Sequence, residues 1–154
     1  MHENFYHKVK VYYEDTDAGG IVYYANYLKY FERARTEALA SIGLSNLMIK
    51  DKFGAYIIVK SCNIKYNKSA NLEDVLNIRS FVKSITKTSF IMSQIITRDD
   101  KIITEAEVHL VFVNEKKNQL KYQKKFLITL NHIFVVVLNC RNFFCFFKQI
   151  HHHF

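Results

Sequence analysis

The chain has 154 residues, enough for one domain with a sizeable core. Its content of 49% hydrophobic and 15% aromatic residues excludes a largely disordered protein. The formal net charge of +8 is concentrated late in the chain, where residues 114–154 hold 7 Lys/Arg against a single acid. A basic excess can serve nucleic acid, anionic lipid or a phosphorylated cofactor. No aromatic–basic recognition motif accompanies it, so we interpret it as a solvated surface and expect no specific nucleic-acid partner.

The cysteines and the first residues indicate the compartment. Three cysteines, an odd number without a CxxC spacing, argue against a disulfide framework and fit a reducing environment. Residues 1–10 contain no hydrophobic signal segment. We therefore expect a cytoplasmic protein.

The first third of the chain predicts a strand, a tight turn and a long helix. Residues 7–14 alternate apolar and polar side chains, as in a half-buried strand. Gly19 and Gly20 supply the backbone freedom that a strand-to-helix reversal needs. Apolar residues then recur at helical spacing from Tyr23 to about Ile42, with Gly43 as a C-cap. The stripe comprises Tyr24, Tyr27, Leu28, Phe31, Ala34, Ala38 and Ile42.

The middle of the chain predicts an antiparallel sheet. Residues 44–53 are short and mixed and suggest a single helical turn, and four strands follow over 55–65, 75–84, 88–97 and 102–113. Their links are short, which requires antiparallel neighbours. We predict an α+β fold in which one helix covers one face of the sheet.

The end of the chain has a different character. An apolar run over 126–138 is followed by a Phe-rich stretch to residue 154. The run is too short for a transmembrane span. We divide the chain into a domain over 1–126 and an extension over 127–154. The extension has three open interpretations: a packed element, a membrane-surface contact, or a segment without a role.

The turn before the helix is the strongest candidate for chemistry. It places Asp17 beside a helix start, where unpaired N–H groups create an electropositive end. The N–H groups of such an arrangement can polarise a substrate carbonyl that lies next to the carboxylate. Asp17 can also be a turn residue that bonds its own backbone. A calcium loop starting at Asp15 is excluded because its twelfth position is Asn26 instead of Glu. The late cysteines and histidines fit no standard zinc spacing, so we expect no metal.

Several motifs together resemble a known enzyme family. They are Glu14–Asp17, Gly19–Tyr23, Asn26–Leu28 and Glu32–Glu37, then Tyr66, Ala70, Glu73–Asp74, Thr86–Phe90 and Glu105–Val108. Over roughly residues 8–125 the chain resembles the hotdog-fold thioesterases, specifically the 4-hydroxybenzoyl-CoA thioesterase family and its YbgC-like acyl-CoA thioesterase branch. The resemblance implies a hotdog fold, an antiparallel sheet wrapped around one long central helix. It also implies a homodimer or homotetramer whose subunits pair to build the active sites between them.

The resemblance implies hydrolysis of acyl-CoA to free acid and CoA without a cofactor. Asp17 would be the nucleophile, passing through an anhydride, or the general base on a water. The Tyr24 backbone N–H would hold the thioester oxygen. Lys87, Thr88 and Ser89 occupy the place of a family cluster that binds the CoA phosphates. Gly20 and Tyr27 complete the expected substrate-binding set.

The chain departs from the family at Tyr24, where many YbgC-like members have His, so no mechanism can need an imidazole there. It also has Ser69 where Pro is common, and its end matches nothing in the family. The rival hypothesis is a non-catalytic hotdog module that binds acyl-CoA or acyl carrier protein within an envelope or lipid-synthesis complex. A hotdog dehydratase ranks last, because residues 18–40 contain no His.

Overall fold

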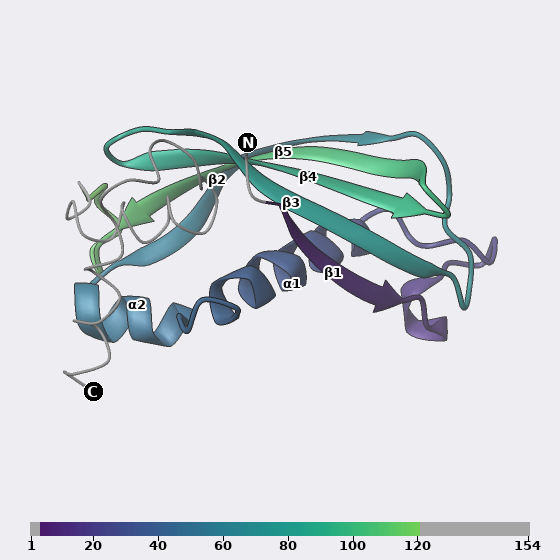
Figure 1. Ribbon diagram of the computed structural model, residues 1–154, viewed down its shortest axis with the longest axis horizontal. Coiled ribbons are helices and arrows are strands. Elements are labelled where there is room, and N and C mark those ends of the chain that lie inside the picture. Colours follow the sequence, from purple (N-terminus) through teal and green to yellow (C-terminus); the bar gives the residue numbers. More distant parts are fainter. Residues whose placement is uncertain (1–3, 121–154) are drawn as a thin grey trace, which may run out of the picture.

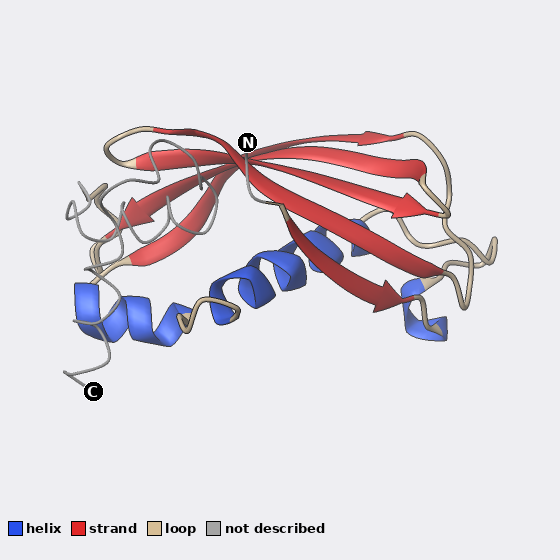
Figure 2. Cartoon of the chain, in the orientation of Figure 1, coloured by secondary structure: helices blue, strands red, loops and turns tan. Residues whose placement is uncertain are grey.

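A computed structural model describes residues 4–120 of the chain. Five strands form one antiparallel sheet in the order β1-β3-β4-β5-β2 (Figures 1 and 2). The strands are β1 (Phe5–Lys10), β2 (Tyr56–Tyr66), β3 (Val75–Ile85), β4 (Ser89–Arg98) and β5 (Lys101–Val113). The α+β prediction is therefore confirmed.

One helix, α1 (Asn26–Ala40), lies along the concave face of the sheet (Figure 1). Its apolar face is buried because it packs against β1 and β3. Tyr27, Phe31, Ala34 and Ala38 from the predicted stripe are all buried. Tyr24 and Leu28 are instead 60% and 44% exposed, while Tyr30, outside the predicted stripe, is fully buried. At the start of the helix the buried face is therefore rotated from the predicted stripe, so that it includes Tyr30 in place of Tyr24 and Leu28.

The first strand is shorter than predicted. β1 ends at Lys10, and the chain then enters a 3-10 turn, η1 (Tyr13–Asp15). The alternation predicts Tyr13 on the same face as Val9 and Val11, which are buried, but Tyr13 is 82% exposed, so this part of the prediction is wrong. The reason is local: the buried Asp15 carboxylate accepts a hydrogen bond from the Tyr12 N–H at 2.9 Å, which bends the chain away from the strand.

The segment predicted as a single helical turn is a longer helix, α2 (Asn46–Phe53). The Ser45 hydroxyl caps its start by accepting from the Met48 N–H at 3.1 Å. Gly54 ends it in the left-handed conformation, at φ +59°. Two good caps therefore extend an element whose apolar pattern is weak.

The four later strands begin and end within one residue of their predicted limits. Asp99 and Asp100 form the predicted β4–β5 turn with φ values of 49° and 61°. No helix within residues 4–120 is long and apolar enough to cross a membrane. The predicted extension over 127–154 lies outside the described residues, as does its proposed boundary.

Candidate active site

The turn that carries Asp17 is a small closed loop. Thr16 and Val22 form an isolated antiparallel bridge at its base. Inside it, the Asp17 N–H donates to the Ile21 carbonyl and the Gly20 N–H to the Asp17 carbonyl, each at 2.9 Å. Gly20 adopts φ +74°, which favours glycine. The backbone alone therefore fixes where the Asp17 side chain begins.

The Asp17 carboxylate is exposed at the tip of this loop. Its Oδ1 accepts a hydrogen bond from the Gly19 N–H at 2.8 Å. A Cβ atom at Gly19 would lie only 3.1 Å from that oxygen, so glycine permits the close approach. Within residues 4–120 no hydrogen bond involves Oδ2. One oxygen orients the group and the other is available to a substrate or a water.

The loop is attached to the domain on both sides. The Val22 N–H donates to the Ala70 carbonyl at 2.8 Å. The Asp15 carbonyl accepts from the Tyr23 N–H and from the Asn26 side-chain amide, each at 2.9 Å. Asp15 and Asn26 are both buried. The hydrogen bond from the Asn26 side-chain amide to the Asp15 carbonyl joins the start of the loop to the first residue of α1.

The start of α1 presents free N–H groups. Ala25 is the N-cap residue, and no side chain caps the helix. In the described part of the chain the Tyr24 N–H donates to no acceptor, whereas the Asn26 N–H donates to the Tyr23 carbonyl at 2.8 Å. An uncapped helix start carries partial positive charge. It can therefore stabilise negative charge that develops on an oxygen nearby.

Tyrosines surround this helix start. The Tyr66 hydroxyl donates to the Tyr24 carbonyl at 3.2 Å, and the two rings meet edge to face at 6.2 Å. Tyr27 is 3% exposed, and its hydroxyl accepts from the Ala70 N–H at 3.0 Å. Burial raises the pKa of Tyr27 and of Tyr66, so both phenols stay protonated at neutral pH. The expected substrate-binding residue Tyr27 thus lies in the core beneath the loop.

The predicted CoA-binding residues lie elsewhere in the subunit. Lys87, Thr88 and Ser89 belong to the β3–β4 turn, which is closed by a hydrogen bond from the Thr86 N–H to the Ser89 carbonyl at 2.8 Å. β3 starts next to the Asp17 loop and ends ten residues later, a span of roughly 33 Å. Figure 1 shows this turn at the end of the sheet opposite the loop before α1. Within one subunit, the Lys87–Ser89 segment and the Asp17 loop are therefore not brought together.

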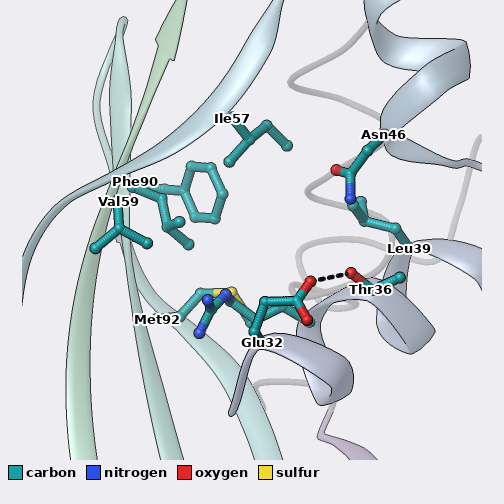
Figure 3. Close-up of a pocket in the computed structure, with 10 residues that line it drawn as sticks. Glu32, Thr36, Leu39, Asn46, Ile57, Val59, Phe90 and Met92 are labelled. Carbon is teal, nitrogen blue, oxygen red and sulfur yellow. Dashed lines mark hydrogen bonds between the residues drawn. The ribbon is translucent and has the colours of Figure 1, made fainter. Parts of the chain in front are cut away.

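A groove opens at that opposite end, between the two helices and the sheet (Figure 3). It encloses about 170 Å³ and its wall is mainly apolar. It is lined by Glu32, Arg35, Thr36, Leu39, Asn46, Ile57, Val59, Phe90, Met92 and Leu110. Within residues 4–120 no group of three His, Cys, Asp or Glu side chains could hold a metal ion.

Sequence reasoning identified the loop and missed its supports. The hydrogen bonds from the Asn26 side-chain amide to Asp15 and from the Tyr66 hydroxyl to Tyr24 could not be predicted from sequence spacing, because each joins residues that the fold brings together. The sequence also did not indicate that Asp15 is buried.

Comparison with known proteins agrees with this architecture. The family model described as "Thioesterase-like superfamily" matches residues 11–129. The acyl-CoA thioester hydrolase YbgC of Escherichia coli O6:H1 is 39% identical over 110 residues, which cover 71% of this chain and 81% of the relative. The acyl-CoA thioesterase YbgC of Haemophilus influenzae is 31% identical over 134 residues, covering 86% and 98%.

A solved structure has the same fold. The crystal structure of a protein from Aquifex aeolicus superposes with a TM-score of 0.77 at 27% identity, covering 82% of this chain and 98% of that one. The Asp17 loop, the uncapped helix start and these relatives lead to one conclusion: the chain belongs to the thioesterase-like superfamily, as a relative of the YbgC acyl-CoA thioesterases.

Proposed function

We propose that this chain hydrolyses acyl-CoA thioesters at the Asp17 loop. The relatives at 31–39% identity are named acyl-CoA thioesterases or thioester hydrolases, and thioester hydrolysis is the activity that the family membership supports. The observation that carries the assignment to this site is the Asp17 carboxylate, with Oδ1 held by the Gly19 N–H and Oδ2 free, beside an uncapped helix start.

Two routes are open to Asp17. As a nucleophile, its free oxygen adds to the thioester carbon, the C–S bond breaks, and CoA leaves as a thiolate that takes up a proton. Water then hydrolyses the resulting anhydride and restores the carboxylate. As a general base, Asp17 instead removes a proton from a water that attacks the same carbon. In both routes the Tyr24 N–H stabilises the oxyanion, so the Tyr24 phenol needs no chemical role.

The site is completed by a second subunit in this proposal. Lys87, Thr88 and Ser89 lie at the far end of the sheet from Asp17 in one subunit, so they can reach the CoA bound at Asp17 only from another copy. We therefore propose a homodimer as the smallest active unit, with a homotetramer compatible with it. A cytoplasmic location and an acyl carrier protein as an alternative acyl donor belong to the same proposal.

The route can be distinguished by a single-turnover reaction in H₂¹⁸O with enzyme in excess of acyl-CoA. If water attacks the anhydride at the Asp17 carbonyl carbon, ¹⁸O is left in the Asp17 peptide. General-base catalysis instead puts all the label in the free acid. The non-catalytic module predicts a different result altogether: acyl-CoA binds, and thiol release stays at the background rate for every acyl group tested. The comparisons favour the hydrolase over this alternative.

A further inference from the structure

Asp15 is a carboxylate that the proposed reaction does not use, although it lies two residues before Asp17. It is only 4% exposed, so its side chain is almost entirely removed from water. A carboxylate in such a position is costly unless hydrogen bonds or a cation stabilise its charge. Neither of the ion pairs within residues 4–120 includes Asp15. Hydrogen bonds must therefore stabilise this carboxylate.

One donor to the Asp15 carboxylate comes from the backbone. Its Oδ2 accepts a hydrogen bond from the Tyr12 N–H at 2.9 Å, at the 3-10 turn η1. Among the described residues no other hydrogen bond of normal geometry reaches this carboxylate. Because the two oxygens of a carboxylate offer about four lone-pair sites, one backbone donor leaves most of its accepting capacity unused. A second donor from the surrounding core would stabilise the charge further.

A buried donor without an acceptor lies on α1. The Tyr30 side chain is fully buried, and its hydroxyl makes no hydrogen bond of normal geometry within residues 4–120. Burial raises the pKa of Tyr30 most, and the charge of Asp15 and hydrogen bonding to it raise that pKa further. The hydroxyl therefore lies close to the Asp15 carboxylate. Buried polar groups in folded proteins are rarely left without a partner, so a donor and an acceptor in one enclosed place are natural partners.

The spacing along α1 brings Tyr30 to the same residue as Asn26. The buried Asn26 side chain donates from its amide to the Asp15 carbonyl at 2.9 Å. Tyr30 follows Asn26 by four residues, and residues four apart lie one above the other on the same face of an α-helix. The first two turns of α1 therefore present two enclosed polar side chains to Asp15, an amide to its carbonyl and a phenol to its carboxylate.

We propose that Asp15 and Tyr30 form a positioning pair for the reaction, in which the Tyr30 hydroxyl donates a hydrogen bond to the Asp15 carboxylate. This inference rests on the hydrolase function proposed above. The pair joins two elements that the reaction needs at a fixed separation, because Asp15 precedes the loop that presents Asp17 and Tyr30 belongs to the helix whose start presents the Tyr24 N–H. Both members are buried and act on the reaction through these two elements, without touching the substrate.

Removal of the hydroxyl alone tests the pair. Tyr30→Phe keeps the ring in the core, and Thr104→Val is the matched control, because Thr104 is the other described residue whose buried hydroxyl has no hydrogen bond. In thiol release from acyl-CoA, kcat of Tyr30→Phe should lie about fivefold to tenfold below wild type, with KM within about twofold. Thr104→Val should keep both constants within about twofold of wild type. An unchanged kcat in Tyr30→Phe would overturn the pair.

A double-mutant cycle shows whether the hydroxyl acts through Asp15. Asp15→Asn keeps an oxygen that can accept from the Tyr12 N–H and removes the charge. In the Asp15→Asn background we expect Tyr30→Phe to lower kcat by less than about twofold, because the bond that it removes is already weakened. The same loss of kcat in both backgrounds would overturn the pair, since a merely structural effect of the phenol does not depend on the Asp15 charge.

The outcomes separate this pair from the hydrolase function itself. A wild type that releases no thiol would overturn the hydrolase function and the positioning role with it. Turnover by wild type, with Tyr30→Phe as active as Thr104→Val, would overturn the pair alone. Circular dichroism and thermal unfolding show which variants are folded at the assay temperature. If Asp15→Asn does not fold, the kcat of Tyr30→Phe against that of Thr104→Val decides the question.

Discussion

The side-chain amide of Asn26 donates to the Asp15 carbonyl oxygen at 2.9 Å, in a fully enclosed position at the start of α1. The same carbonyl also accepts from the Tyr23 N–H at 2.9 Å. The two bonds attach the first residue of the helix to the loop that presents Asp17. The position of the Asp17 loop relative to the free N–H groups of the helix is therefore set by a buried contact.

Asn26→Ala should lower both stability and turnover. Loss of a buried hydrogen bond costs about 1–2 kcal/mol in the free energy of unfolding. The loop and the helix start also lose their fixed spacing, so kcat should fall more than KM rises. Denaturant unfolding and steady-state kinetics measure the two effects. Asn118→Ala, at an exposed position, should leave stability within about 0.5 kcal/mol of wild type.

Asp74→Ala should cost more stability than Glu107→Ala. Asp74 is ion-paired with Arg98, is only 20% exposed, and also accepts from the Asn71 N–H at 2.7 Å. Glu107 pairs with Lys83 at an exposed position, 48% accessible, where an ion pair contributes about 0–1 kcal/mol. We expect a loss of about 1.5–3 kcal/mol for Asp74→Ala. Equal losses in the two variants, measured by urea unfolding, would contradict this ranking.

Tyr66→Phe should reduce kcat/KM by less than about tenfold, because it removes one partly exposed hydrogen bond, to the Tyr24 carbonyl. The edge-to-face ring contact is retained. Tyr13→Phe, whose ring is 82% exposed, is the control and should have wild-type kinetics. A loss far above tenfold would mean that the Tyr66 phenol takes part in the chemistry itself.

Stability should decline in alkaline solution, partly through Tyr30. Burial, followed by the nearby Asp15 carboxylate, raises the pKa of Tyr30. The folded state then holds the phenol proton more tightly than the unfolded state does. This stabilisation is complete below the unfolded pKa of about 10 and is lost as the pH rises toward the folded pKa. Tyr30→Phe should show a shallower fall in unfolding free energy above about pH 10 than wild type, and parallel curves would contradict the assignment.

The sequence predicted the strands well because alternation is a local property. The later four strands agree with the structure within one residue, and β3 and β4 bury every second side chain on one face over most of their length. β1 was predicted too long, because Val11 and Tyr13 continue the alternation while the Asp15 carboxylate redirects the backbone. The rotation of the α1 face toward Tyr30 depends on packing against β1 and β3, which no spacing within the helix encodes.

The candidate site was predictable only in part. The glycines and acids of the loop indicated a turn at Asp17 before the helix, which the structure has, while the catalytic role of Asp17 stays a prediction. The position of Lys87–Ser89 relative to Asp17 was not predictable from one chain, because the two ends of β3 lie far apart. The roles assigned to these residues remain proposals that depend on the second subunit.

The most direct test of the account is release of free CoA thiol by wild type and Asp17→Asn, measured in parallel on acyl-CoA substrates from short aliphatic chains to benzoyl. Asparagine retains an oxygen that can accept the hydrogen bond from the Gly19 N–H, so the loop should keep its shape. Asp51→Asn, at an exposed site on α2, is the control.

We expect wild type and Asp51→Asn to turn over at least one substrate, whereas kcat of Asp17→Asn should fall by about 10²–10⁴. Calorimetry should show that the Asp17→Asn variant still binds that substrate. Turnover by Asp17→Asn at the wild-type rate would contradict the central claim that this carboxylate carries the reaction.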